Sequence, residues 1–447
     1  MDTTPSFWGL KLMNAFSMGM IGSAQVYLPI FNKKVLDLST DRIGFIQSIT
    51  PFMSCLAFPF WTAIVDKTQK HKVVGMTNMT VALVTVLCVT LVPSLTDDQT
   101  VATVLVSLCD FGFAFFGYPI IATMVDSITL RVLGDRKEQL YGRQKAFGPL
   151  GFGGSVFLTG LVMDRFGPYA LFGSYAFFVI SFLITAFFTS FEPYAWHDDE
   201  VDHSHSSRSS SFDGTVAHTD SLRSDLDKEE KPPTISDLLV CEGAARFFTV
   251  MTLLGVCMSV FFAFLTLFIG TDLHGSPALL GLLGPLGSSV EIVCFFFTKE
   301  IFGWLGADRM LLIGQAISAY RCVVYIISVT WFPDSSAVFA TLTQIVHGAS
   351  FSLIWSAGVI KADAIAPPGM KSRAQGLLGM VYFGLGSGVG ALLGGVVYEH
   401  YGSALMWGMV LVVVCLSAFV QTSSFLDRLA PTARIRAGYT AVAPFVG

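Results

Sequence analysis

Apolar stretches of spanning length follow one another along most of the chain, separated by short polar loops. A helix needs about 20 mostly apolar residues to cross the hydrocarbon core of a bilayer. The stretches at 99–130 and 335–361 are longer than that, so we expect them to tilt or protrude. The pattern predicts an all-α protein with twelve transmembrane helices, over residues 7–31, 41–65, 73–94, 99–130, 145–163, 168–190, 245–271, 277–298, 309–332, 335–361, 372–398 and 402–425.

Three stretches in the second half carry an ionisable residue near the middle: Glu291, Arg321 and His347. A charge at the bilayer centre costs at least about 2.5 kcal/mol, so it rarely persists without a partner or a water-filled cavity. Tyr325 shares the helical face of Arg321, and Gln344 shares that of His347, which makes both candidate substrate contacts. Glu291 and Arg321 lie at a similar depth, so we expect them to pair if their two helices face one cavity. The three residues would then line a functional cavity. The alternative interpretation is that Glu291 and Arg321 form a purely structural ion pair, beside a histidine whose hydrogen bonds are all made within the protein.

Two polar residues stand out in the apolar stretches of the first half. Asp110 lies in the middle of the fourth stretch and is a candidate proton site or substrate contact. A buried, protonated carboxyl bonded to the backbone explains it equally well. Asn14 lies one helical turn after Lys11, near the predicted cytoplasmic end of the first stretch, and is a further candidate substrate contact. For Lys11 itself, an ammonium group that extends to the membrane surface is favoured over contact with substrate.

The composition excludes a soluble protein. Hydrophobic residues make up 53% of the 447 residues and charged residues only 13%, against about 25% charged in soluble chains. The net charge of -5 is concentrated in one loop and gives no reason to expect a nucleic-acid partner. No phosphate-binding loop motif or metal-ligand spacing occurs, so we expect neither an enzyme nor a primary pump, and no metal or cofactor.

The basic residues of the short loops are concentrated on one side of the predicted bundle. Lysine and arginine are enriched in cytoplasmic loops, so this bias sets the orientation. It places both termini in the cytoplasm, in the plasma membrane or an endomembrane. The cytoplasmic side holds Lys67, Lys70, Lys72, Arg131, Arg136, Lys137, Arg143, Lys145, Lys299, Arg309, Lys361, Lys371, Arg373, Arg428, Arg434 and Arg436, against Lys33, Lys34, Arg42 and Arg165 on the other.

Residues 192–234 differ in composition from the rest of the chain. This segment holds 11 Asp and Glu, 4 Lys and Arg and 8 Ser, a composition that predicts a disordered cytoplasmic linker. It separates an N-terminal six-helix bundle, residues 1–191, from a C-terminal six-helix bundle, residues 235–426, with a cytoplasmic tail at 427–447.

An internal repeat supports this division into two similar bundles. When the chain is shifted by 235 residues, Gly151 falls on Gly386, and Gly160 falls on Gly395. Small residues at such spacing let helix backbones approach closely in a membrane. Two similar halves joined by a linker are typical of secondary transporters, which bind substrate near the bilayer midplane between the halves.

Residues 61–70, WTAIVDKTQK, follow the second predicted helix and resemble the gate motif of the major facilitator superfamily. Thr62 and Gln69 stand where glycines are usual. The resemblance covers nearly all of the chain outside the linker and the tail, and it is strongest to the group that includes oligosaccharide:proton and nucleoside:proton symporters. It implies that Asp66 is the gate acid, with Lys67 beside it.

Residues 141–148, YGRQKAFG, look like the start of the fifth helix in the sugar:proton symporters. In that group an arginine at the position of Lys145 pairs with an acid at the position of Asp126, and the pair binds sugar hydroxyls. The resemblance therefore implies that Asp126 and Lys145 contact substrate. Lysine offers a point charge rather than the planar fork of arginine.

In the second half, Glu291, Arg321 and His347 match the group's proton-coupling positions. The group has a further acid one turn after the histidine, where this chain has Ser350. The resemblance implies a proton as coupling ion, with the three matching residues as its candidate carriers.

Together these observations predict a secondary active transporter with the major facilitator fold. It would move a small polar organic solute, sugar-like or nucleoside-like, by alternating access of two pseudo-symmetric bundles, and we expect a monomer in the lipid bilayer. The alternatives are a non-transporting receptor or scaffold on the same fold, and a uniporter without ion coupling.

Overall fold

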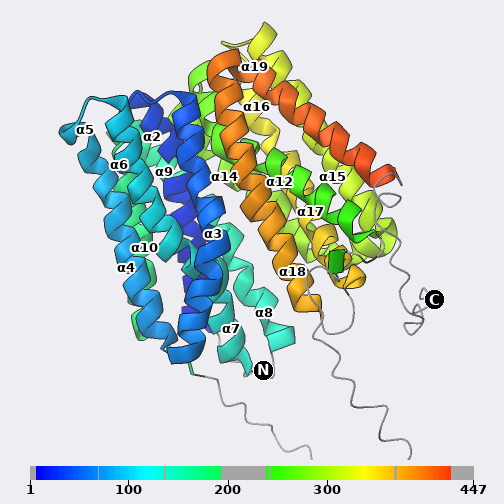
Figure 1. Ribbon diagram of the computed structural model, residues 1–447. Coiled ribbons are helices and arrows are strands. Elements are labelled where there is room, and N and C mark those ends of the chain that lie inside the picture. The colour runs from blue at the N-terminus through cyan, green and yellow to red at the C-terminus, as the bar shows by residue number, and fades with distance from the viewer. Residues whose placement is uncertain are drawn as a thin grey trace, which may run out of the picture.

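The computed structural model describes residues 7–68, 70–134, 137–192, 238–239, 241, 243–366 and 370–423. Almost all of the predicted linker and the whole of the predicted tail lie outside these residues. The described residues form helices, with no strand among them. The helices divide into two groups that lie side by side, one from each half of the chain (Figure 1).

The first half contains α1 (Trp8–Met20), η1 (Ile21–Gln25), α2 (Leu28–Lys34), α3 (Thr40–Thr68), α4 (His71–Cys88), η2 (Val89–Leu91), α5 (Val92–Leu95), α6 (Gln99–Gly112), η3 (Phe113–Gly117), η4 (Ile120–Met124), α7 (Val125–Leu133), α8 (Lys137–Lys145), α9 (Phe147–Phe166) and α10 (Ala170–Phe188). The second half contains α12 (Ala244–Leu267), η6 (Phe268–Asp272), α13 (Pro277–Gly281), α14 (Leu283–Phe296), α15 (Thr298–Trp331), α16 (Ala337–Leu342), α17 (Gln344–Ile365), α18 (Lys371–Gly379), η7 (Met380–Gly386) and α19 (Ser387–Thr422).

The helices agree with the predicted membrane-spanning pattern. By length and apolar composition, 10 stretches of the described chain are suited to cross a membrane. The last of them, Arg373–Thr422, contains a non-helical residue at Gly402 (φ 83°), the first residue of the last predicted span. The first predicted span is divided among α1, η1 and α2, so all twelve predicted stretches fall on described helices.

Two predicted spans are less regular than the sequence pattern suggests. The first contains a π-helical turn, Ile21–Gln25, and restarts at α2 with a proline in its first turn. The fourth, expected as one long tilted helix, contains two π-helical turns on either side of Pro119. Proline has no backbone N–H to donate and its ring crowds the preceding turn, which favours such irregular turns, although α3 continues as an α-helix through Pro51 and Pro59.

The repeated glycines make equivalent contacts in the two halves. A Cβ atom on Gly151 of α9 would collide with the backbone of Ala15 in α1. At the matching position, a Cβ on Gly386 would lie 2.6 Å from the carbonyl oxygen of Thr252 in α12. Each half therefore packs its fifth predicted helix against its first at a point where only glycine fits. This confirms the pseudo-symmetry of the two halves.

A second pair of glycine contacts joins one half to the other. A Cβ on Gly160 of α9 would lie 2.7 Å from the Cα of Gly281, and a Cβ on Gly395 of α19 would lie 2.8 Å from the Cα of Gly44 in α3. We call Gly44, Gly160, Gly281 and Gly395 the glycine seam. Beside it, the Thr40 backbone N–H donates to the Glu399 carboxylate at 2.5 Å. The seam lies toward the side of the membrane that the basic-residue bias predicts to be non-cytoplasmic.

Candidate functional site

The first half holds an ion pair between α7 and α8. Asp126 lies in the first turn of α7, and Lys145 is the last residue of α8. The Nζ atom of Lys145 donates to both carboxylate oxygens of Asp126, at 2.7 Å each. The side chains are 35% and 24% exposed for Lys145 and Asp126. The two residues that the resemblance brought together are thus in contact, and both are partly exposed.

Residues of α1 lie close to this pair. Asn14 is buried and donates to the Leu10 carbonyl oxygen at 3.0 Å and to the Thr129 hydroxyl at 3.4 Å. Thr129 lies almost one helical turn beyond Asp126 in α7, so Asn14 ties α1 to the helix that carries the acid. The Lys11 ammonium group lies 4.8 Å from the centre of the Trp8 ring, a distance suited to a cation–π interaction.

Arg321 of α15 forms the polar centre of the second half and is fully buried. Its guanidinium group contacts His347 Nδ1 at 2.6 Å, and donates to Tyr325 Oη at 2.8 Å and to Gln344 Oε1 at 2.5 Å. It also lies 4.3 Å from the centre of the Phe261 ring. Tyr325 and Gln344, predicted as substrate contacts, therefore hold Arg321 in this structure. We call these five residues the Arg321 cluster.

The tautomer of His347 follows from this contact. A guanidinium group has only donors, so the Nδ1 atom of His347 must accept. The ring is then neutral, with its proton on Nε2. His347 faces Gly287 of α14, because a Cβ there would lie 3.9 Å from the His347 Cδ2 atom. The histidine thus lies between Arg321 and the helix that carries Glu291.

Glu291 does not pair with Arg321 among the described residues, in contrast to the expectation from their depth. The reason is the close approach of α14 and α17. A Cβ on Gly348 of α17 would lie 2.7 Å from the backbone nitrogen of Glu291 and would collide with the carbonyl oxygen of Gly287. At this approach the ring of His347, rather than the carboxyl of Glu291, meets the guanidinium group.

Ser350 stands where the related symporters have a further acid. Its hydroxyl donates to the Gly314 carbonyl oxygen at 2.8 Å and lies 2.9 Å from the Ser318 hydroxyl. Ser350 is fully buried. In this chain the position therefore joins α15 to α17 through neutral hydrogen bonds.

Residues 61–68 of the gate motif form the end of α3, and Lys70 directly precedes α4. Lys67 is exposed there, and the side chain of Asp66 lies outside the described residues. The sequence interpretation missed an ion pair in the second half, between Lys361 of α17 and Asp308 of α15. The sequence offered one signal for it: Asp308 directly precedes Arg309, and both Arg309 and Lys361 were predicted to lie on the cytoplasmic side.

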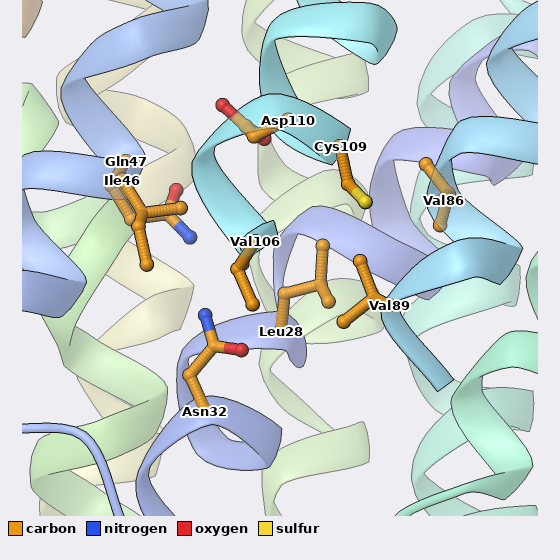
Figure 2. A pocket seen from close by; sticks show the side chains of 9 residues that line it. All are labelled: Leu28, Asn32, Ile46, Gln47, Val86, Val89, Val106, Cys109 and Asp110. Atoms are coloured by element: carbon orange, nitrogen blue, oxygen red, sulfur yellow. The ribbon is translucent and has the colours of Figure 1, made fainter. Parts of the chain in front are cut away.

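Asp110 lies apart from the other candidates, in a pocket among α2, α3, α4 and α6 (Figure 2). Its Oδ2 atom accepts a hydrogen bond from the Thr50 hydroxyl at 3.2 Å. The pocket also contains Asn32, which the sequence interpretation did not single out because it lies at the polar end of a span.

Known proteins with similar sequences are transporters. The chain is 24% identical to the maltose permease of Geobacillus stearothermophilus over 84% of this chain and 83% of that protein. It is also 30% identical to the uncharacterized transporter YwbF of Bacillus subtilis (strain 168). That second match covers 36% of this chain and spans only 37% of the length of YwbF.

Solved structures with a similar fold are transporters as well. The structure of the nucleoside transporter NupG gives a TM-score of 0.67 at 16% identity, over 95% of this chain and 98% of that chain. A bacterial homologue of the iron transporter ferroportin gives 0.66 at 12% identity, over 93% and 97%. At such identities the likeness shows the fold, which is the major facilitator fold that the sequence predicts.

One family model describes most of the molecule. The model of the MFS_1-like family matches residues 7–409, which include both glycine repeats, the Asp126–Lys145 pair and the Arg321 cluster. The chain therefore belongs to the MFS_1-like family of major facilitator transporters.

Proposed function

We propose that the protein is a secondary active transporter for a small polar organic solute, sugar-like or nucleoside-like, that is carried together with a proton. The observation that carries the proposal is the Asp126–Lys145 pair. Its ammonium group lies 2.7 Å from both carboxylate oxygens, and both side chains are partly exposed. A pair of this kind presents a charged donor and a charged acceptor next to each other, in a protein that spans the membrane.

The chemistry of such a pair favours a solute rich in hydroxyl groups. A hydroxyl can donate to the Asp126 carboxylate and accept from the Lys145 ammonium group at the same time. Hydrogen bonds to charged groups are stronger than those between neutral groups. The names of two similar proteins, a maltose permease and a nucleoside transporter, fit this class of solute.

Glu291 is the proposed proton carrier. It lies partly buried in α14, and the described residues place no ammonium or guanidinium group within 4.0 Å of its carboxyl. A carboxyl without a fixed counter-charge inside a membrane is free to gain and lose a proton as its surroundings change. The neutral His347 contacts Arg321 and precedes Gly348, the residue of α17 that packs against the backbone of Glu291. We propose that His347 transmits changes at the substrate site to Glu291.

Uptake into proteoliposomes tests the proposal. Purified protein would be reconstituted and supplied with radiolabelled sugars and nucleosides, with and without an inward proton gradient. We expect accumulation of one solute class above its outside concentration, and loss of that accumulation when the gradient is collapsed by a protonophore. The same solute should raise the thermal midpoint of the purified protein, because it binds only the folded state.

The rival functions predict different outcomes in the same experiment. A uniporter would equilibrate the solute without responding to the proton gradient. A receptor or scaffold would bind the solute without carrying it across the membrane. Failure of every sugar and nucleoside in both binding and uptake would overturn the proposed solute class.

A further inference from the structure

The first half contains a small pocket that the proposed transport mechanism does not use. It has room for about one water molecule and opens among α2, α3, α4 and α6. Apolar side chains form most of its wall. Its lining consists of Leu28, Asn32, Ile46, Gln47, Val86, Val89, Val106, Cys109 and Asp110 (Figure 2).

Asn32 is an unusual residue for such a wall. It is fully buried, and neither atom of its side-chain amide has a hydrogen-bond partner among the described residues. A buried amide without a partner is strongly unfavourable, so each such group in a native protein calls for an explanation. A water molecule or an ion in the pocket would give Asn32 the missing partner.

Asp110 stands at the other end of the pocket. The amide of Gln25 donates to the Thr50 hydroxyl at 3.5 Å, and Thr50 donates its single hydrogen to the Asp110 carboxyl at 3.2 Å. Within the described part of the chain, no lysine, arginine or histidine nitrogen lies within 4.0 Å of this carboxyl. A carboxylate at this depth needs a positive charge from elsewhere.

The first predicted span changes its helical geometry next to these residues. Gln25 ends the π-helical turn Ile21–Gln25, and the chain resumes helical structure at Leu28, which lines the pocket. π-helical turns are frequent at functional sites.

From these four observations we propose that Asp110 is a site for one small monovalent cation, a proton or a sodium ion, which reaches it through this pocket. The path begins at Asn32, at the end of α2 and on the predicted non-cytoplasmic side. Figure 2 shows the side chain of Gln47 at a level between Asn32 and Asp110. The site is independent of the Asp126–Lys145 pair and of the Arg321 cluster, so its test does not depend on the transported solute.

The thermal stability of the purified protein tests the site in two arms. In the first, sodium chloride replaces choline chloride at constant ionic strength and pH; in the second, the pH is lowered without sodium. A sodium site gives a saturable rise of the thermal midpoint in the first arm, and a proton site gives a rise in the second, because a ligand of the folded state stabilises it. Either rise should be absent in Asp110→Asn.

Two further variants keep this test decisive if Asp110→Asn fails to fold. Asn32→Ala removes the unpartnered amide from the pocket that it shares with Asp110. It should weaken the apparent affinity for the cation about tenfold, the effect of losing one hydrogen bond near a charge. Asn78→Ala is the matched control, since the Asn78 amide nitrogen is also buried without a partner but does not line the pocket. An unchanged response in Asn32→Ala, or no response of the wild-type protein in either arm, would overturn the proposal.

Silver ions test the path itself, because Ag⁺ is a small monovalent cation that binds thiols. The test uses Asn32→Cys and Asn78→Cys, each in a background with the 8 native cysteines replaced. In sealed vesicles, externally added Ag⁺ should block Asn32→Cys much faster than Asn78→Cys, as measured by later labelling of the free thiol. Equal rates for the two variants would show that no path leads to Asn32.

Discussion

The two halves of the molecule hold their central charges in opposite ways. In the first half, Lys145 faces a carboxylate, and both partners are partly exposed. In the second half, Arg321 is fully buried and contacts three neutral side chains and an aromatic ring. One half neutralises its cation with an ion pair, and the other distributes the charge over hydrogen bonds.

This difference bears on which half can respond to a substrate. An exposed ion pair contributes only about 0–1 kcal/mol, so the Asp126–Lys145 pair can be opened by a solute that replaces each partner. Breaking the buried Arg321 cluster leaves several polar groups without partners, which costs far more. The first half is therefore suited to exchange partners, and the second half is suited to hold its geometry while a proton moves nearby.

The largest effect should come from removing the centre of the Arg321 cluster. Arg321→Ala leaves Tyr325, Gln344 and His347 without their donor and opens a cavity over Phe261. We expect the free energy of unfolding to fall by about 3 kcal/mol or more, with loss of proton-driven accumulation. Thermal midpoints in detergent measure this change. Arg309→Ala, an exposed arginine of the same helix, is the control and should have little effect.

Glu291→Gln should separate transport from coupling. The amide cannot release a proton, so accumulation against a gradient should be abolished. Exchange of labelled for unlabelled solute should partly survive, because it needs no net proton movement. Glu300→Gln, at an exposed site, should behave like the wild type. Normal accumulation in Glu291→Gln would exclude this residue as carrier.

Lys145→Met should weaken substrate binding about tenfold or more, since it removes a charged donor, but should change the free energy of unfolding by only about 1 kcal/mol. Lys145→Arg keeps the charge and should be milder. Titration calorimetry with the transported solute measures the first effect and thermal unfolding measures the second. Wild-type affinity in Lys145→Met would mean that the ion pair does not touch the solute.

The smallest effect should come from Tyr325→Phe. It removes one hydroxyl that accepts from Arg321 and lies 2.6 Å from Thr343, while His347 and Gln344 still hold the guanidinium group. The expected loss of stability is about 1 kcal/mol, visible as a lower thermal midpoint with substrate affinity unchanged. If Tyr325→Phe lowered the free energy of unfolding as much as Arg321→Ala, the hydrogen bonds of His347 and Gln344 to Arg321 would contribute no stability of their own.

Much of the fold could be predicted because each membrane-spanning helix requires a long apolar stretch, which is visible in the sequence. The glycine repeat likewise pointed to the observed backbone contacts at Gly151 and Gly386. The partner of Arg321 could not be predicted in the same way. Sequence position gives the depth of a side chain, but it does not give the rotation of the helix that carries it. Glu291 and His347 both had suitable depths, and the close approach of α14 and α17 decided between them.

Asn32 shows a second limit of prediction from sequence. A polar residue at the end of an apolar stretch normally faces water or lipid headgroups, so nothing in the pattern distinguishes it. Its burial results from the packing of α3, α4 and α6 around the pocket that it lines. Such a placement depends on contacts between distant segments of the chain, which no local pattern contains.

The glycine seam has a consequence for the speed of conformational change. At Gly44, Gly160, Gly281 and Gly395 the two halves meet through backbone atoms, with no side chain between them. Surfaces without side chains have no rotamers to freeze when they close and no interlocking groups to withdraw when they open. Parting the halves at these four positions therefore withdraws no side chain, whereas contacts elsewhere between the halves, such as Phe52 against Gly388 and the hydrogen bond of Thr40 with Glu399, must be broken when they part.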